Sequence, residues 1–256
     1  MLARLALLFA LSTFCFGQTS PLAPTSPQPI TITAAQVYTP SPNTQWVFQN
    51  GYGDLTFITQ QAPTPSDYLP AGSINWVFQK NACRAYWGAG ICDALNHFVL
   101  VQQPDGSWTS PATLFYFPTQ IPAYMNGFHM MTMNVTQVPG EIVPYTIIPA
   151  SATAGVTVSG QTQYDRWEAF GSYTFGSILS AAGSSNGRIS WKTVSYIENV
   201  STPLYTGPAL VSDQYEDACI HEKWYFAPGL GLVKIVPLDN GSCTPSDPNL
   251  AIVKIS

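Results

Sequence analysis

The clearest structural pattern in the chain lies in residues 212–238, SDQYEDACIHEKWYFAPGLGLVKIVPL. Residues 220–227 and 232–237 are rich in the aromatic and β-branched side chains that fit a pleated, half-buried surface. Residues 228–231, PGLG, lie between them, and a proline with two glycines favours a reversal of the chain. The pattern therefore predicts a β-hairpin.

The first strand of this hairpin separates its side chains onto two faces, because successive residues of a strand point in opposite directions. One face is apolar except for a single glutamate, and the other is amphipathic. The first face carries Ile220, Glu222, Trp224 and Phe226, and the second carries Cys219, His221, Lys223 and Tyr225.

Residues 224–234, WYFAPGLGLVK, resemble a hairpin of many secreted and periplasmic bacterial β proteins, with Leu230 where valine is usual. Some of those proteins are similar to the outer-membrane lipoprotein carrier group, a curved antiparallel half-barrel that holds acyl chains. The resemblance covers this hairpin alone and carries over no catalytic residue. It implies a curved sheet, a bacterial source and an apolar ligand, although a fold does not fix a function.

Further short strands with turn signals between them follow one another from Gln45 onward. Only residues 167–182 have a helical pattern, and two glycines weaken it. We therefore expect an all-β fold, an antiparallel curved sheet, half-barrel or sandwich with little helix, as one domain over residues 45–256. The expected strands are residues 45–49, 75–79, 98–102, 113–117, 128–135, 145–148, 155–159, 173–178, 188–197 and 252–255.

The N-terminal region has two parts. Residues 1–17 combine an early arginine, an apolar run and small residues near the end, which is typical of a secretory signal cut before Gln18. Residues 18–44 are rich in proline, serine and threonine and predict an extended linker, with residues 30–33 as an edge strand within it. We expect a secreted or periplasmic protein with no transmembrane anchor.

Charged residues make up only 9% of the chain, against a usual share of about 25%. The net charge is −5 and there are nine lysines and arginines, so nucleic acid is not an expected partner. The sequence shows no polybasic cluster for anionic lipid either. Hydrophobic residues, at 46%, are sufficient for a large core.

Four cysteines follow the signal sequence, and an even number in an exported chain indicates disulfides. Four cysteines allow three pairings. Cys83 and Cys92 flank one turn, and Cys219 and Cys243 flank the C-terminal hairpin. We expect the pairs Cys83–Cys92 and Cys219–Cys243.

Acidic residues and a histidine gather at the start of the hairpin. Carboxylates could bind Ca²⁺, and a histidine with a carboxylate could bind Zn²⁺. The spacing matches no known ligand motif, and we favour the simpler interpretation, a solvated loop that leads into a strand. We expect no metal or other cofactor; the candidate ligands are Asp213, Glu216, Asp217 and His221.

All methionines other than Met1 fall within residues 125–133. On a strand, His129, Met131 and Met133 share one face. Thioethers beside an imidazole suit Cu(I), but methionine also fills irregular cores or lines pliable apolar pockets. We favour an apolar ligand pocket that includes these residues and Trp224.

Two further signals favour a carbohydrate-active protein. Glycoside hydrolysis needs two carboxylates, and the candidate pairs are Asp165 with Glu168 and Glu198 with Glu222. The chain also has seven tryptophans and thirteen tyrosines, some of which could stack on sugars. Trp87 and Trp108 lie beside turns, so we expect both to be exposed.

From these signals we expect an exported protein that binds an apolar or amphipathic, lipid-like ligand and is not an enzyme. The first alternative is a carbohydrate-binding or glycoside-hydrolysing protein. The second is a structural protein of the cell envelope or cell surface.

Overall fold

The computed structural model describes residues 28–61, 74–80, 95–110, 112–117, 128–135, 145–171, 184–216, 220–238 and 249–256. Within these residues almost all regular structure is antiparallel strand, so the all-β fold is confirmed. The elements are β1 (Thr31–Thr33), α1 (Ala34–Val37), β2 (Gln45–Gln49), β3 (Leu55–Gln61), β4 (Ile74–Lys80), β5 (Leu95–Gln102), β6 (Trp108–Ser110), β7 (Ala112–Phe117), β8 (Phe128–Val135), β9 (Tyr145–Ile148), β10 (Ser151–Thr153), β11 (Val158–Gly171), β12 (Ser184–Ser201), β13 (Thr206–Glu216), β14 (Ile220–Ala227), β15 (Gly231–Pro237) and β16 (Leu250–Ile255).

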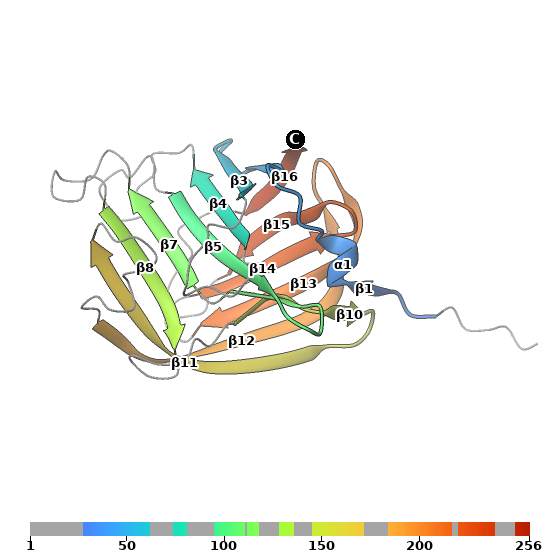
Figure 1. The fold of residues 1–256 in the computed structure, drawn as a ribbon. Helices are drawn as coiled ribbons and strands as arrows, with labels where there is room; N and C mark the ends of the chain where they lie inside the picture. Colours follow the sequence, from blue (N-terminus) through green and yellow to red (C-terminus); the bar gives the residue numbers. More distant parts are fainter. Residues whose placement is uncertain are drawn as a thin grey trace, which may run out of the picture.

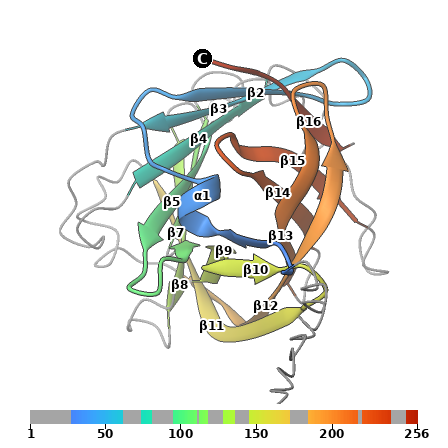
Figure 2. The same ribbon diagram turned by 90° about the vertical axis from the view of Figure 1, so that its right-hand side faces the viewer.

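Fourteen of the described strands form one sheet in the order β4-β3-β2-β16-β15-β14-β13-β12-β11-β8-β7-β5-β6-β9. β4 also pairs with β5, so the sheet curves far enough to bring these two strands side by side. Figures 1 and 2 show the resulting curvature, with α1 and the small β1–β10 sheet lying within the bend. The expected curved antiparallel sheet is therefore present.

The predicted C-terminal hairpin is confirmed as β14 and β15, which pair through Trp224↔Ile235 and Tyr225↔Lys234. The register shifts after Tyr225, because Phe226 pairs with Leu232 and leaves Val233 as an extra residue. Such a bulge bends the strand and increases its twist, which suits a strongly curved sheet.

The structure of residues 31–38 differs from the linker expected there. Residues 31–37, predicted to belong to a linker apart from an edge strand, form β1 and α1, and the buried side chains of Ile32, Val37 and Tyr38 pack into the core. A capping box between Thr33 and Gln36 starts the short helix, because each supplies a partner for the other's backbone N–H. The domain therefore begins before Gln45. The signal sequence expected at residues 1–17 lies outside the described residues.

The bounds of other predicted segments differ from those in the structure. Residues 188–197, expected as a short strand, belong to the longer strand β12, whereas the strand expected at residues 155–159 begins only at Val158, where the long strand β11 starts. The helical pattern of residues 167–182 is wrong for its first part, because β11 continues to Gly171. The strand expected at residues 173–178 lies outside the described residues. In the part of the chain that is described, no helix is long and apolar enough to cross a membrane.

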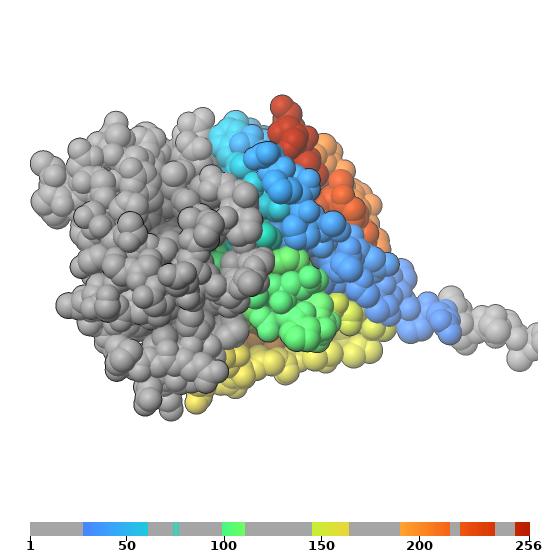
Figure 3. All heavy atoms as spheres, viewed as in Figure 1, coloured from blue at the N-terminus to red at the C-terminus, as the bar shows by residue number. Residues whose placement is uncertain are grey.

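The turn between β14 and β15 is held by the N-terminal part of the chain. The backbone N–H of Gly229 donates to the carbonyl of Gln36 over 2.8 Å, and the Trp46 indole donates to the carbonyl of Leu230 over 2.8 Å. Gly231 has a positive φ of 81°, and a Cβ at this position would lie 3.3 Å from Trp46 Nε1. In Figure 3 the N-terminal segment, in blue, lies against the C-terminal strands in orange and red.

This arrangement predicts different costs for two alanine substitutions in one turn. Gly229 also has a positive φ, but a Cβ there would meet no atom within 4 Å. We expect Gly229→Ala to lower the free energy of unfolding by roughly 1–2 kcal/mol through backbone strain alone. Gly231→Ala should cost about 1 kcal/mol more, because it also crowds the Trp46 ring. Chemical denaturation of both variants measures the difference, and equal losses would show that the Trp46 contact is unimportant.

Candidate functional site

The register of β12, β13 and β14 sorts their side chains onto two faces. The row Val194–Asp213–Lys223 and the row Tyr196–Val211–Tyr225 lie on one face, which we call the outer face. The row Ser195–Ser212–Trp224 lies on the other, inner face, which packs into the core. The same short segment of β14 therefore supplies groups to two separate environments.

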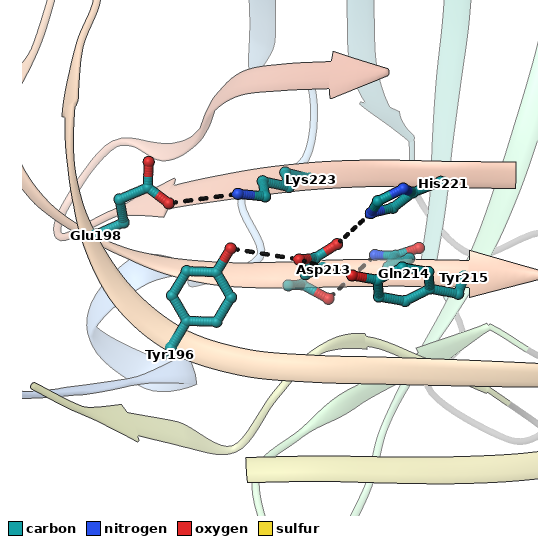
Figure 4. A network of polar contacts seen from close by, with 8 residues as sticks. Tyr196, Glu198, Asp213, Gln214, Tyr215, His221 and Lys223 are labelled. Atoms are coloured by element: carbon teal, nitrogen blue, oxygen red, sulfur yellow. Dashed lines mark hydrogen bonds and ion pairs between the residues drawn. The ribbon is translucent and has the colours of Figure 1, made fainter. Parts of the chain in front are cut away.

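A polar network on the outer face centres on Asp213, whose side chain is buried (Figure 4). Its Oδ1 lies 3.1 Å from Nε2 of His221, and its Oδ2 accepts hydrogen bonds from the hydroxyls of Tyr196 and Tyr215, each at 3.3 Å. The rings of Tyr215 and His221 stack with their centroids 4.0 Å apart. Three donors satisfy one buried carboxylate, so Asp213 links β12, β13 and β14.

Lys223 and Glu198 extend this network along the sheet. Their charged groups lie 3.7 Å apart, and the Tyr225 hydroxyl donates to Glu198 Oε1 over 3.4 Å. Burial, with the negative charge of Glu198 beside it, raises the pKa of Tyr225 to about 12. A hydrogen bond to the Tyr196 oxygen raises the pKa of Lys223, so its ammonium group stays charged. We call Tyr196, Glu198, Asp213, Tyr215, His221, Lys223 and Tyr225 the outer network.

The structure brings together two of the four candidate metal ligands, Asp213 and His221. The side chain of Glu216 and the whole of Asp217 lie outside the description. Among the side chains that are described, no group of three or more histidines, cysteines, aspartates and glutamates is arranged to hold a metal. The contacts of Asp213 are those of a carboxylate that joins strands.

Glu222 lies on the inner face, where its Oε2 accepts a hydrogen bond from the Trp224 indole over 2.8 Å. Trp224 is buried and belongs to the core. Glu198 lies on the outer face, because it pairs with Ala209 while Glu222 pairs with Gln214. The predicted carboxylate pair Glu198–Glu222 is therefore wrong: the two groups are separated by the sheet.

Four aromatic side chains meet inside the bend of the sheet, and we call Tyr38, Trp46, Trp76 and Trp108 the inner aromatic cluster. The Tyr38 ring centroid lies 5.0 Å from that of Trp76 and 5.1 Å from that of Trp108, both edge to face. The Trp76 indole donates to the Tyr38 hydroxyl, which donates to Gln60 Oε1, both over 2.8 Å. Burial raises the pKa of Tyr38, which keeps its hydroxyl neutral.

The expectation that Trp108 is exposed is wrong, since only 3% of it is accessible. The turn beside Trp108 does not expose it, because β6 pairs with both β5 and β9 and directs the indole against Tyr38. Trp87, the other tryptophan expected to be exposed, lies outside the described residues.

For the remaining candidates, the structure shows at most the strand on which each residue lies. His129, Met131 and Met133 lie on β8, whose bounds match the predicted strand, between β7 and β11. Asp165 and Glu168 lie on β11 on either side of a register shift. The four cysteines, Cys83, Cys92, Cys219 and Cys243, lie outside the described residues, so their pairing stays a prediction.

Several residues of these two sites carry no signal in the sequence. Tyr38 lies in a proline-rich segment, and Gln60 is a polar residue of a strand. Tyr196 and Tyr215 belong to different strands, and only their pairing register brings both hydroxyls to Asp213. The alternation within β14 was the only usable signal, and it placed His221 and Lys223 correctly on one face.

No protein-family model, no curated protein and no solved structure matches this chain.

The outer network predicts a graded loss of stability. Asp213→Asn removes the charge that three donors share, so we expect the free energy of unfolding to fall by about 1–3 kcal/mol. Tyr215→Phe removes one donor and leaves the carboxylate with two partners, so about 1 kcal/mol should be lost. Denaturant unfolding of both variants tests this order, and a larger loss from Tyr215→Phe would contradict the central role of Asp213.

The raised pKa of Tyr225 predicts a loss of stability in alkali. Between pH 10, where an unfolded tyrosine ionises, and about pH 12, the folded state holds a proton that the unfolded state has released. The free energy of unfolding should therefore fall as the pH rises through this window. Tyr225→Phe should make the fall shallower in denaturation curves recorded from pH 9 to 12. An unchanged slope would contradict the assignment to Tyr225.

Proposed function

We propose that this protein is an exported binding protein, not an enzyme, that holds an amphipathic molecule against the inner face of its curved sheet. One observation carries the proposal: the indole N–H of Trp108 is buried and has no hydrogen-bond partner among the residues that the structure describes. The proposal also agrees with the apolar ligand that the hairpin resemblance implies.

The Trp108 N–H differs from the other indole donors. The structure describes the side chains of five tryptophans, and four of them donate to a partner in the protein. These are Trp46 to Leu230 O at 2.8 Å, Trp76 to Tyr38 Oη at 2.8 Å, Trp191 to Thr193 Oγ1 at 3.2 Å and Trp224 to Glu222 Oε2 at 2.8 Å. Four of the five described indole N–H groups thus have an acceptor within the protein, and that of Trp108 is the exception.

A buried donor left without an acceptor costs about 1–3 kcal/mol, so a native protein that keeps one calls for an explanation. A bound molecule that places an acceptor atom beside this N–H would be such an explanation. The neighbours of Trp108 in the inner aromatic cluster are largely apolar ring surfaces, so the rest of that molecule would be apolar. An apolar body with one carbonyl, ether or carboxylate oxygen fits both requirements.

Glycan binding remains the alternative, and the half-exposed tyrosines and charged groups of the outer network favour it. Hydrolysis by Glu198 with Glu222 is not part of this alternative, because these carboxylates lie on opposite faces.

Native mass spectrometry of the full-length protein, purified from an exporting host, tests the proposed function. We expect a lipid-sized adduct that is lost on denaturation. Trp108→Phe keeps a ring but removes the N–H, so the adduct should be lost or bound about tenfold more weakly. Trp76→Phe is the matched control, because it removes an indole N–H already satisfied within the protein, and it should keep the adduct.

The same two variants should also differ in their free energy of unfolding. In protein freed of adduct, both substitutions lose the same ring atoms, but only Trp76→Phe breaks a hydrogen bond. Trp76→Phe should therefore lower the free energy of unfolding by about 1–3 kcal/mol more than Trp108→Phe. A wild-type protein with no adduct, or a Trp108→Phe variant that retains it fully, would overturn the proposal.

A further inference from the structure

The four lysines whose side chains the structure describes all lie on one face of the sheet. Lys192, Lys223, Lys234 and Lys254 belong to β12, β14, β15 and β16. Lys192 pairs with Tyr215, which pairs with His221, two residues from Lys223 on the same face. Lys223 is likewise two residues from Tyr225, which pairs with Lys234.

The register continues this face to β16. Lys234 pairs with Ala251, which pairs with Gln49. Val47, two residues from Gln49 on β2, pairs with Lys254. Lys254 is therefore also on the outer face, which now spans β12 to β16 and β2.

These four lysines follow a diagonal line across the strands, which we call the lysine stripe. Each step crosses one or two strands and moves about two residues along them. With strands about 4.8 Å apart and a rise of about 3.4 Å per residue, neighbouring lysines lie roughly 8–12 Å from one another. An otherwise acidic protein, with a net charge of −5, thus presents a line of positive charges on one face.

Tyrosine rings hold three of these ammonium groups in place. Lys192 Nζ lies 5.7 Å from the ring centroid of Tyr215, Lys223 Nζ lies 5.6 Å from that of Tyr196, and Lys234 Nζ lies 5.7 Å from that of Tyr225. A cation held over an aromatic ring is attracted by its face. The stripe is therefore partly ordered before any ligand arrives, which lowers the entropy lost on binding.

Most of this charge is available to a ligand. Among the described side chains the ion pairs are Lys223 with Glu198 and His221 with Asp213. Lys192 and Lys254 are exposed and Lys234 is half-exposed, and none of the three has a described carboxylate partner.

We propose that the lysine stripe binds a linear acidic glycan, a chain of sugars that carries carboxylate or sulfate groups along its length. The ammonium groups would contact successive anionic groups, and the half-exposed Tyr196 and Glu198 side chains would contact sugar hydroxyls. This surface is separate from the inner face and does not depend on the ligand proposed there.

Two other polyanions fit this surface less well. Single-stranded nucleic acid would stack bases on aromatic faces, but the ammonium groups already occupy those of Tyr196, Tyr215 and Tyr225. A bilayer favours exposed apolar side chains beside the cations. The large exposed hydrophobic residues among those described are Ile30, Tyr52, Val156, Val158 and Leu204, and none belongs to the stripe.

Binding of the full-length protein to polygalacturonate, with dextran as the neutral polymer, tests this proposal. We expect saturable binding to polygalacturonate that weakens as salt is added, and no binding to dextran. The triple variant Lys192→Gln, Lys234→Gln and Lys254→Gln should bind about tenfold more weakly, from the loss of three exposed charge contacts. The matched triple variant with arginine at these positions keeps the charge and should bind as the wild type does.

Equal binding by the glutamine and wild-type proteins would overturn the proposal, and so would equal binding to dextran. Stronger binding to vesicles that contain an anionic phospholipid, or to single-stranded DNA, than to polygalacturonate would also overturn it and assign the stripe to that polyanion. Circular dichroism of both triple variants confirms that they fold. The inner-face adduct should be unchanged in both, because none of the three lysines lies on that face.

Discussion

The contact between Trp46 and the turn of the C-terminal hairpin joins residues separated by 184 positions in the sequence. The Trp46 indole donates to Leu230, its ring lies against Gly231, and Gln36 accepts from Gly229. The strand order places the N-terminal strand β2 next to the C-terminal strand β16, so this contact lies where the two ends of the chain meet in the sheet. Glycine at position 231 leaves the space that this contact needs.

The alternation of side chains along β14 divides the chemistry of the molecule between two faces. Glu222 and Trp224 face the core, while His221 and Lys223 lie on the outer face with Asp213. The two proposed ligands differ for this reason. An apolar environment with one unsatisfied donor suits an amphipathic molecule, whereas a half-exposed face with tyrosines and lysines suits a polyanion that stays hydrated.

Buried polar groups in this protein are mostly paired, which makes the exception at Trp108 informative. Asp213 has three donors, and the Tyr38 hydroxyl both accepts from Trp76 and donates to Gln60. In a low-dielectric interior such networks hold strands in one arrangement, because any shift would leave a polar group without a partner. The cost of leaving a buried polar group without a partner therefore explains two features. It keeps the outer network in one arrangement, and it is the reason to expect an acceptor for the Trp108 N–H.

The sequence alone was enough to predict the fold class, the hairpin of β14 and β15, the bounds of β8 and the face on which His221 and Lys223 lie, because these depend on local turn chemistry and on a period of two. It did not reveal that residues 31–38 pack into the core, since the prolines around them resemble a linker. Which distant residues meet became clear only from the folded structure. The contact of Tyr196 and Tyr215 with Asp213, the burial of Trp108, the separation of Glu198 from Glu222 and the alignment of four lysines all depend on strand order and register, which are set by long-range pairing and leave no local pattern in the chain.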